Sequence, residues 1–205
     1  MKITSIEPQR NKNRVNIYVD NIFSIGIDEE LRYKYKLEID MEVNDEFIKE
    51  VLEAEERSKV LNHALNLLSY RQRSENEIYN ALKRKGFESS HIEYAMNYCR
   101  ENRYLDDKDF AQSFIKDKTN LNKLGPKRIR YELILKGISK DIIDELLIVD
   151  YEEQYEIAME IALKKLKSYK NDDYNSIYRK LSGFLQRKGY SYDIISKVVK
   201  DILKD

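Results

Sequence analysis

Three hexapeptides decide the fold of this chain: LKRKGF (82–87), LILKGI (133–138) and LQRKGY (185–190). Each begins with leucine and ends in Lys-Gly followed by an apolar residue, and an isoleucine stands six residues after each glycine. Because glycine readily adopts the left-handed conformation that ends a helix, each hexapeptide predicts a helix C-terminus. The spacing of 51 and 52 residues predicts three copies of one structural unit, ending their central helices at Gly86, Gly137 and Gly189.

Helix-start signals around these glycines predict three helices in each unit. Ser74 with Glu77 forms a capping box, and Gly125-Pro126 places proline at a first helical position. Further N-cap candidates are Ser90 (with Glu93), Ser139 and Ser191. In the second and third units, helices are expected near residues 107–119, 126–136, 140–149, 152–168, 173–188 and 192–203.

The first 43 residues differ from the rest. Val15, Ile17 and Val19 alternate with polar or aromatic residues, and Asp20-Asn21 is a turn signal, so residues 14–27 are predicted to form a β-hairpin. A short helix is expected to begin at residues 28–30 and to run to about Tyr35. From residue 44 the apolar period becomes helical, which predicts one long helix to about Tyr70.

These observations predict a mainly α fold of three tandem three-helix-bundle repeats in an elongated array, with a small N-terminal antiparallel β element. One small bundle buries little apolar surface, so the units are expected to pack on their neighbours. The predicted divisions are an N-terminal hairpin region (1–43), the long helix with the first repeat (44–104), the second repeat (105–150) and the third repeat (151–205).

Composition argues against catalysis, metal binding and membrane insertion. The chain has two histidines, His63 and His91, and one cysteine, Cys99, which falls on an apolar helix face and is interpreted as a core residue. The acidic run 106–109 is interpreted as a helix start. No stretch of about 18 apolar residues occurs. We therefore expect a cytoplasmic monomer with no membrane segment, catalytic residue, cofactor or metal.

Charge is unevenly distributed although the net charge is zero. Residues 27–57 hold twelve acidic and five basic residues, whereas residues 111–140 hold eight basic and two acidic residues. Such charge belongs either to solvated helix faces or to an electropositive surface for an acidic partner, nucleic acid or protein. The acidic segment 140–149 argues against a helix that reads DNA bases, while nonspecific contact with the DNA backbone stays open. A protein partner is favoured.

Several segments together resemble the RecX family, regulators of the RecA recombinase: ALNLL (64–68), RSENEI (73–78), LKRKGF (82–87), YLDDKDFA (104–111) and GPKRIRYEL (125–133). The resemblance covers about residues 55–203 and is most specific in the first two units. The N-terminal forty or so residues resemble the extension of longer members. The third unit departs from the pattern because it lacks a Gly-Pro start, which puts its contacts in doubt.

The resemblance implies tandem three-helix repeats that lodge in the groove of the RecA–DNA filament. It implies inhibition of RecA ATP hydrolysis, strand exchange and coprotease activity, and so a part in homologous recombination, DNA repair and the SOS response. The alternative is a sequence-nonspecific DNA-binding protein that acts alone. Candidate contacts with RecA or DNA, each of which could instead serve solubility alone, are Arg71, Arg73, Lys83, Arg84, Lys116, Lys123, Lys127, Arg128 and Arg130.

Overall fold

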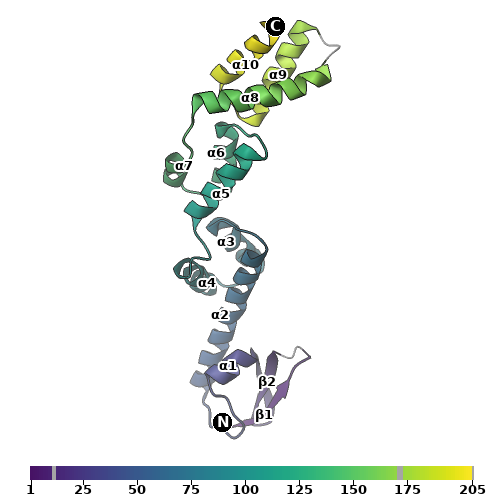
Figure 1. The fold of residues 1–205 in the computed structure, drawn as a ribbon. Helices are drawn as coiled ribbons and strands as arrows, with labels where there is room; N and C mark the ends of the chain where they lie inside the picture. The colour runs from purple at the N-terminus through teal and green to yellow at the C-terminus, as the bar shows by residue number, and fades with distance from the viewer. Residues whose placement is uncertain (11–12, 170–172, 205) are drawn as a thin grey trace. The chain divides into compact units, whose positions relative to one another are not determined.

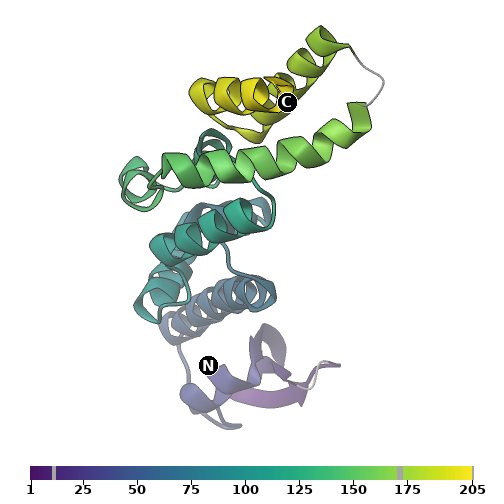
Figure 2. The ribbon, with the colours of Figure 1, turned by 45° about the horizontal axis from the view of Figure 1, so that its top comes forward.

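The computed structural model describes residues 1–10, 13–169 and 173–204. Within these residues the chain forms ten α-helices and one three-stranded sheet (Figures 1 and 2). The chain divides into two compact units. The first unit comprises Met1–Arg71 with Ile78–Tyr104, and the second comprises Gln72–Glu77 with Leu105–Asp205.

The N-terminal sheet contains β1 (Ile3–Pro8), β2 (Arg14–Val19) and β3 (Ile22–Asp28), antiparallel in that order. Asp20 and Asn21 join β2 to β3 with positive φ angles of 49° and 64°. That geometry matches the right-handed twist of a tight hairpin, which is why these two residue types occur there. The predicted hairpin is therefore confirmed, and β1 adds the third strand.

Two helices cover the inner face of the sheet, α1 (Glu29–Lys34) and α2 (Asp45–Tyr70). Apolar residues of alternate strand positions, such as Ile17 and Ile27, are fully buried in this core. Glu55 of α2 is also buried, with 1% of its surface exposed. Its carboxylate accepts a hydrogen bond from the Asp28 backbone N–H (2.9 Å) and lies 2.6 Å from the Arg14 guanidinium. A buried carboxylate needs such partners, so Glu55 ties the long helix to two strands.

The first repeat adds α3 (Glu75–Arg84) and α4 (Ser89–Glu101) to the long helix α2. Helix α4 packs along α2 and buries Ile92, Ala95 and Cys99. The capping box expected at Ser90 and Glu93 is wrong. The N-cap of α4 is Glu88, two residues before Ser90, and its side chain makes no capping hydrogen bond.

The second repeat contains α5 (Asp107–Asn120), α6 (Pro126–Leu135) and α7 (Lys140–Leu146). The predicted continuation of the last helix to residue 149 is wrong. Leu147 turns the chain with non-helical φ and ψ, and Ile148 and Val149 are exposed. Proline at the first position of α6 and the Ser139 N-cap of α7 are confirmed.

The third repeat contains α8 (Tyr151–Leu166), the short 3₁₀-helix η1 (Lys167–Tyr169), α9 (Tyr174–Lys188) and α10 (Tyr192–Lys204). The last two repeats each have their own apolar core. The mainly helical class, the three three-helix units and the N-terminal antiparallel element are thus confirmed. The predicted domain boundaries and the elongated arrangement stay predictions.

Gly137 shows why the repeat keeps glycine after the middle helix. Its φ is 81°, and a Cβ placed there would overlap the side chain of Asn76 in the first turn of α3. Beside it, the Ser74 hydroxyl donates to the Lys136 carbonyl (2.7 Å), and the Lys136 ammonium lies 3.0 Å from the Glu77 carboxylate. The capping box of Ser74 with Glu77 is confirmed and also forms part of this contact.

Gly189 makes the equivalent contact with the first turn of α6. Its φ is 95°, and a Cβ there would overlap the backbone nitrogen of Arg128. The Gly125 N–H donates to the Lys188 carbonyl (2.8 Å), and the Lys127 N–H donates to the Gly189 carbonyl (3.1 Å). The C-terminus of one middle helix therefore meets the N-terminus of the preceding middle helix at both glycines, through side chains at Gly137 and through backbone hydrogen bonds at Gly189.

Two substitutions distinguish the effect of the positive φ from the effect of the close contact at the missing Cβ. Gly86 has a φ of 87° but open space around its missing Cβ, so Gly86→Ala should cost only backbone strain, about 1 kcal/mol of unfolding free energy. Gly189→Ala adds a backbone overlap and should cost about 3 kcal/mol or more. Urea denaturation followed by circular dichroism measures both. Equal losses would show that the close contact at Gly189 contributes nothing.

Candidate partner-binding surface

The nine candidate cations are distributed over both compact units. Those of the first unit are Arg71, Lys83 and Arg84, all exposed. Those of the second unit are Arg73, Lys116, Lys123, Lys127, Arg128 and Arg130. The structure brings two of the second set, Lys127 and Arg128, together in one groove.

The α6–α9 groove lies in the second unit and has a volume of about 740 Å³. Residues from the start of α6 and the end of α9 line it: Leu124, Lys127, Arg128, Tyr131, Glu132, Phe184, Gln186, Arg187, Lys188 and Gly189. Four of them are cationic, one is acidic and two are aromatic. The groove exists because the backbone contact at Gly189 holds these two helix ends together.

Local sequence directs the cations of α6 outward. Ile129 and Leu133 lie one turn apart and are buried in the core of the second repeat, which fixes the inner face of the helix. Lys127, Arg128 and Tyr131 consequently lie on the exposed side. The Arg128 guanidinium carbon is 5.6 Å from the centre of the Tyr131 ring, a cation–π contact.

Internal ion pairs neutralise part of the basic charge. Glu132 contacts Arg128 (2.8 Å) and Lys118 (3.4 Å), and Arg130 and Lys123 pair with acids of α7 and α8. Burial raises the pKa of the Glu132 carboxyl, but the two cations outweigh burial and the pKa is lowered overall. Lys127 forms no ion pair with any residue that the structure describes. The charge available to a partner is therefore smaller than the sequence count.

Sequence reasoning missed the cations of α9. Arg187 and Lys188 line the groove, and Lys188 also donates to the Asn122 carbonyl (2.7 Å). The signal was present in the sequence, since residues 174–188 contain four basic residues and no acidic one. It went unused because the third repeat lacks the Gly-Pro start.

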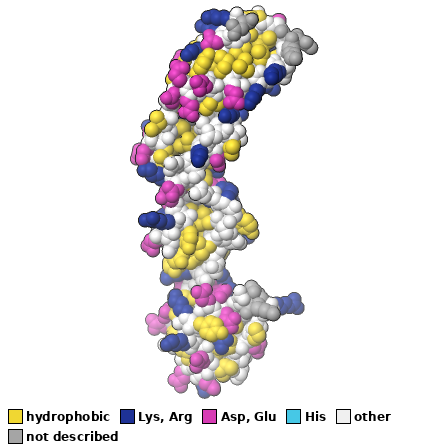
Figure 3. All heavy atoms as spheres, viewed as in Figure 1, with side chains coloured by type: hydrophobic (Ala, Val, Ile, Leu, Met, Phe, Trp, Pro, Cys, Tyr) yellow, Lys and Arg dark blue, Asp and Glu magenta, His cyan; other side chains and the backbone are white. Residues whose placement is uncertain are grey.

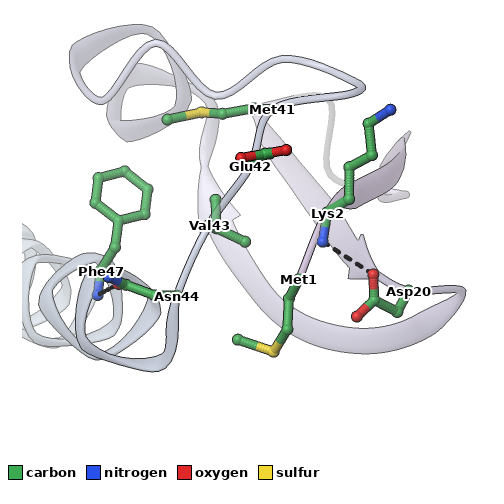
Figure 4. A pocket seen from close by; sticks show the side chains of 8 residues that line it. All are labelled: Met1, Lys2, Asp20, Met41, Glu42, Val43, Asn44 and Phe47. Carbon is green, nitrogen blue, oxygen red and sulfur yellow. Dashed lines mark hydrogen bonds between the residues drawn. The ribbon is translucent and has the colours of Figure 1, made fainter.

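A second hollow, of about 730 Å³, lies in the N-terminal unit beside Met1 and Phe47 (Figure 4). The Lys2 backbone N–H donates to the Asp20 carboxylate (2.9 Å) at its edge. Its lining combines the polar residues Lys2, Asp20, Glu42 and Asn44 with the apolar residues Met1, Met41, Val43 and Phe47.

Cys99 and His91 are both buried in the first unit. Burial raises the pKa of the Cys99 thiol, which is fully buried in the first unit, as expected of a core residue. A ring nitrogen of His91 lies 2.8 Å from the Glu53 carboxylate, and this hydrogen bond lowers the pKa of Glu53. Among residues 1–10, 13–169 and 173–204, no group of three His, Cys, Asp or Glu is placed to hold a metal ion. Over the same residues, no helix is both long and apolar enough to cross a bilayer.

Four family models match the chain, each described as part of the regulatory protein RecX. The N-terminal domain model covers residues 1–44. The first, second and third three-helix domain models cover residues 61–99, 106–147 and 152–199.

Curated relatives and solved structures carry the same name. The regulatory protein RecX of Clostridium botulinum strain Eklund 17B is 39% identical over 98% of this chain and 96% of its own. That of Clostridium perfringens strain 13 is 40% identical over 97% and 95%. A crystal structure of regulatory protein RecX aligns with a TM-score of 0.76 at 30% identity, over 98% of both chains. The crystal structure of RecX from Lactobacillus salivarius gives 0.65 at 32% identity, over 72% of this chain and 97% of its own.

The lowered pKa of Glu132 predicts a pH-dependent contribution to stability. A carboxyl whose pKa is depressed by folding stabilises the protein above its unfolded pKa, about 4.3, and loses that contribution as pH falls through its folded pKa. The difference in unfolding free energy between wild type and Glu132→Gln should be largest at neutral pH and shrink in acid. Urea denaturation across this pH range measures it. Glu156→Gln removes an exposed carboxylate that pairs with no described cation, and it should show no such trend.

Proposed function

This chain belongs to the RecX family of regulatory proteins, and from that premise we propose that it binds the groove of the RecA–DNA filament. In this proposal it inhibits RecA ATP hydrolysis, strand exchange and coprotease activity. It acts by binding, without catalysis or cofactor, in the cytoplasm where RecA works.

The α6–α9 groove is the observation that carries the proposal. Its cations include Lys127, which pairs with no acid in the described part of the chain, and they give a positive surface that can attract an acidic partner, while Tyr131 and Phe184 add apolar area. Charge complementarity of this kind sets encounter rate and orientation, and aromatic area adds affinity.

Repetition supports the same proposal. A filament presents identical sites at regular intervals, and linked binding modules gain avidity when several engage at once. The middle helices of neighbouring repeats in the second unit are joined by backbone hydrogen bonds, so their surfaces hold a fixed mutual geometry. Binding by one repeat then positions the next.

A second candidate function is sequence-nonspecific DNA binding by the protein alone. The specific observation in its favour is the absence of acidic residues from α9, next to the groove. Binding driven by phosphates weakens steeply with salt, so a salt titration with bare DNA distinguishes it from protein docking.

The decisive measurement is DNA-dependent ATP hydrolysis by the cognate RecA, titrated with this protein. Wild type should inhibit, and Lys127→Glu with Arg187→Glu should raise the concentration needed for half-inhibition by about tenfold, because both charges face the groove. Neither residue pairs with a described acid, so the reversal breaks no internal ion pair.

The control variant makes the same change in net charge at residues that do not line the groove. Lys140→Glu with Lys200→Glu alters exposed residues of α7 and α10 and should leave inhibition near the wild-type value. Absence of inhibition by the wild-type protein at every ratio, with filaments intact by electron microscopy, would contradict the proposal.

A further inference from the structure

The long helix α2 has a stripe of small and apolar residues that is only half-buried. Ala54, Ser58, Leu61 and Leu65 are spaced four, three and four residues apart, so they lie on one face of the helix. Val60 of the same helix is fully buried, which marks the face that packs in the core. The stripe spans about 17 Å along the helix axis, or about three turns.

The stripe forms part of a groove of about 770 Å³ in the first unit, which we call the α2 groove. Tyr35, at the end of α1, and Tyr94 and Tyr98 of α4 line it as well. Tyr94 and Tyr98 stand one turn apart and are 43% and 37% exposed. One face of the first unit shows hydrophobic surface next to acidic side chains (Figure 3). The groove therefore offers apolar and aromatic area to a partner.

Acidic residues outnumber basic ones around the α2 groove. Four glutamates and three basic residues line it: Glu30, Glu46, Glu50 and Glu53, with Lys34, Lys49 and Arg57. An adjoining hollow of about 330 Å³ shares Lys49 and Glu53 with the groove and adds Glu56 and Glu88. The four glutamates of the groove belong to the acidic segment 27–57, to which the proposed function gives no role.

Two of the three cations lie against the rings of the groove itself. The Lys34 ammonium is 5.9 Å from the centre of the Tyr35 ring, and the Arg57 guanidinium carbon is 5.4 Å from the centre of the Tyr94 ring. By contrast, Glu30 and Glu46 pair with no cation in the described part of the chain. The charge that remains available to a partner is therefore negative.

We propose that the α2 groove binds a basic amphipathic α-helix of a protein partner. The apolar face of that helix packs on the stripe, Tyr94 and Tyr98, and its Lys or Arg side chains meet the glutamates. This surface belongs to the other compact unit from the α6–α9 groove, so the inference goes beyond the proposed function and does not depend on it.

A helix suits this groove better than an extended peptide or a nucleic acid. A helix satisfies its own backbone hydrogen bonds, whereas an extended peptide on a helical, partly apolar floor would leave its N–H and C=O groups without partners. The glutamates repel phosphates and acidic polypeptides. The three-turn stripe matches the length of a short partner helix.

The test is fluorescence anisotropy of a labelled synthetic helix of leucine and lysine, with leucines at i, i+3, i+4 and i+7, titrated with the full chain. Wild type should bind it about tenfold more tightly than a matched peptide with glutamate in place of lysine. Tyr94→Ser with Tyr98→Ser should weaken binding about tenfold, because two aromatic contacts are lost. Glu30→Gln with Glu46→Gln should weaken it about fivefold and reduce its dependence on salt.

Matched controls make the same changes at exposed residues outside the groove. Tyr174→Ser with Tyr192→Ser, and Glu101→Gln with Glu156→Gln, should bind the basic helix like wild type. Circular dichroism checks the fold of every variant. Equal affinity for the two peptides, losses in the controls as large as those in the groove variants, or tighter binding of a labelled oligothymidylate than of the basic helix would each overturn the inference. No RecA is present in this assay, so such a failure would leave the proposed function intact.

Discussion

The absence of a Cβ atom at Gly137 and Gly189 is the constraint on which the second unit depends. Each glycine ends a middle helix in a left-handed conformation and lets the first turn of the preceding middle helix approach within hydrogen-bonding distance. Any side chain would separate the two helix ends and break the bonds to Lys136 or Lys188. Glycine at these two positions therefore ends a helix and also allows two repeats to pack closely. Gly86 only ends a helix, because nothing lies near its missing Cβ.

The same joint explains the position of the candidate surface. Bringing the end of α9 against the start of α6 places cations from both helices around one groove. Arg187 and Lys188 also suit the negative end of the α9 dipole, so stability alone could account for them. Lys127 and Arg128 stand at the positive end of α6, where cations are unfavourable. The ion pair with Glu132 offsets this for Arg128, whereas Lys127 forms no ion pair with any described residue, so Lys127 is the stronger argument for a binding role.

The sequence predicted the features that depend on local rules. Gly86, Gly137 and Gly189 do adopt positive φ, and the Asp20-Asn21 turn forms, because turn and cap chemistry depends on neighbours along the chain. It did not predict that Glu55 would be buried, because its partners Arg14 and Asp28 come from strands that only tertiary folding brings close. The helix predicted to 149 ended at 146 because packing of the small second core overrides helix propensity beyond the last buried turn.

The number of basic residues in a stretch of sequence does not predict how much positive charge is available to a partner. Residues 111–140 hold eight basic residues, but five of them form internal ion pairs with acids: Lys118, Lys123, Arg128, Arg130 and Lys136. Several of these acids are distant in sequence, so no local charge window contains both partners. Much of the positive charge of the second repeat therefore supports its fold. The positive charge that remains available to a partner lies at the contact between the start of α6 and the end of α9, and on α9, which has no acidic residues. The third repeat, with the weakest sequence pattern, thus contributes as much of the candidate surface as the second.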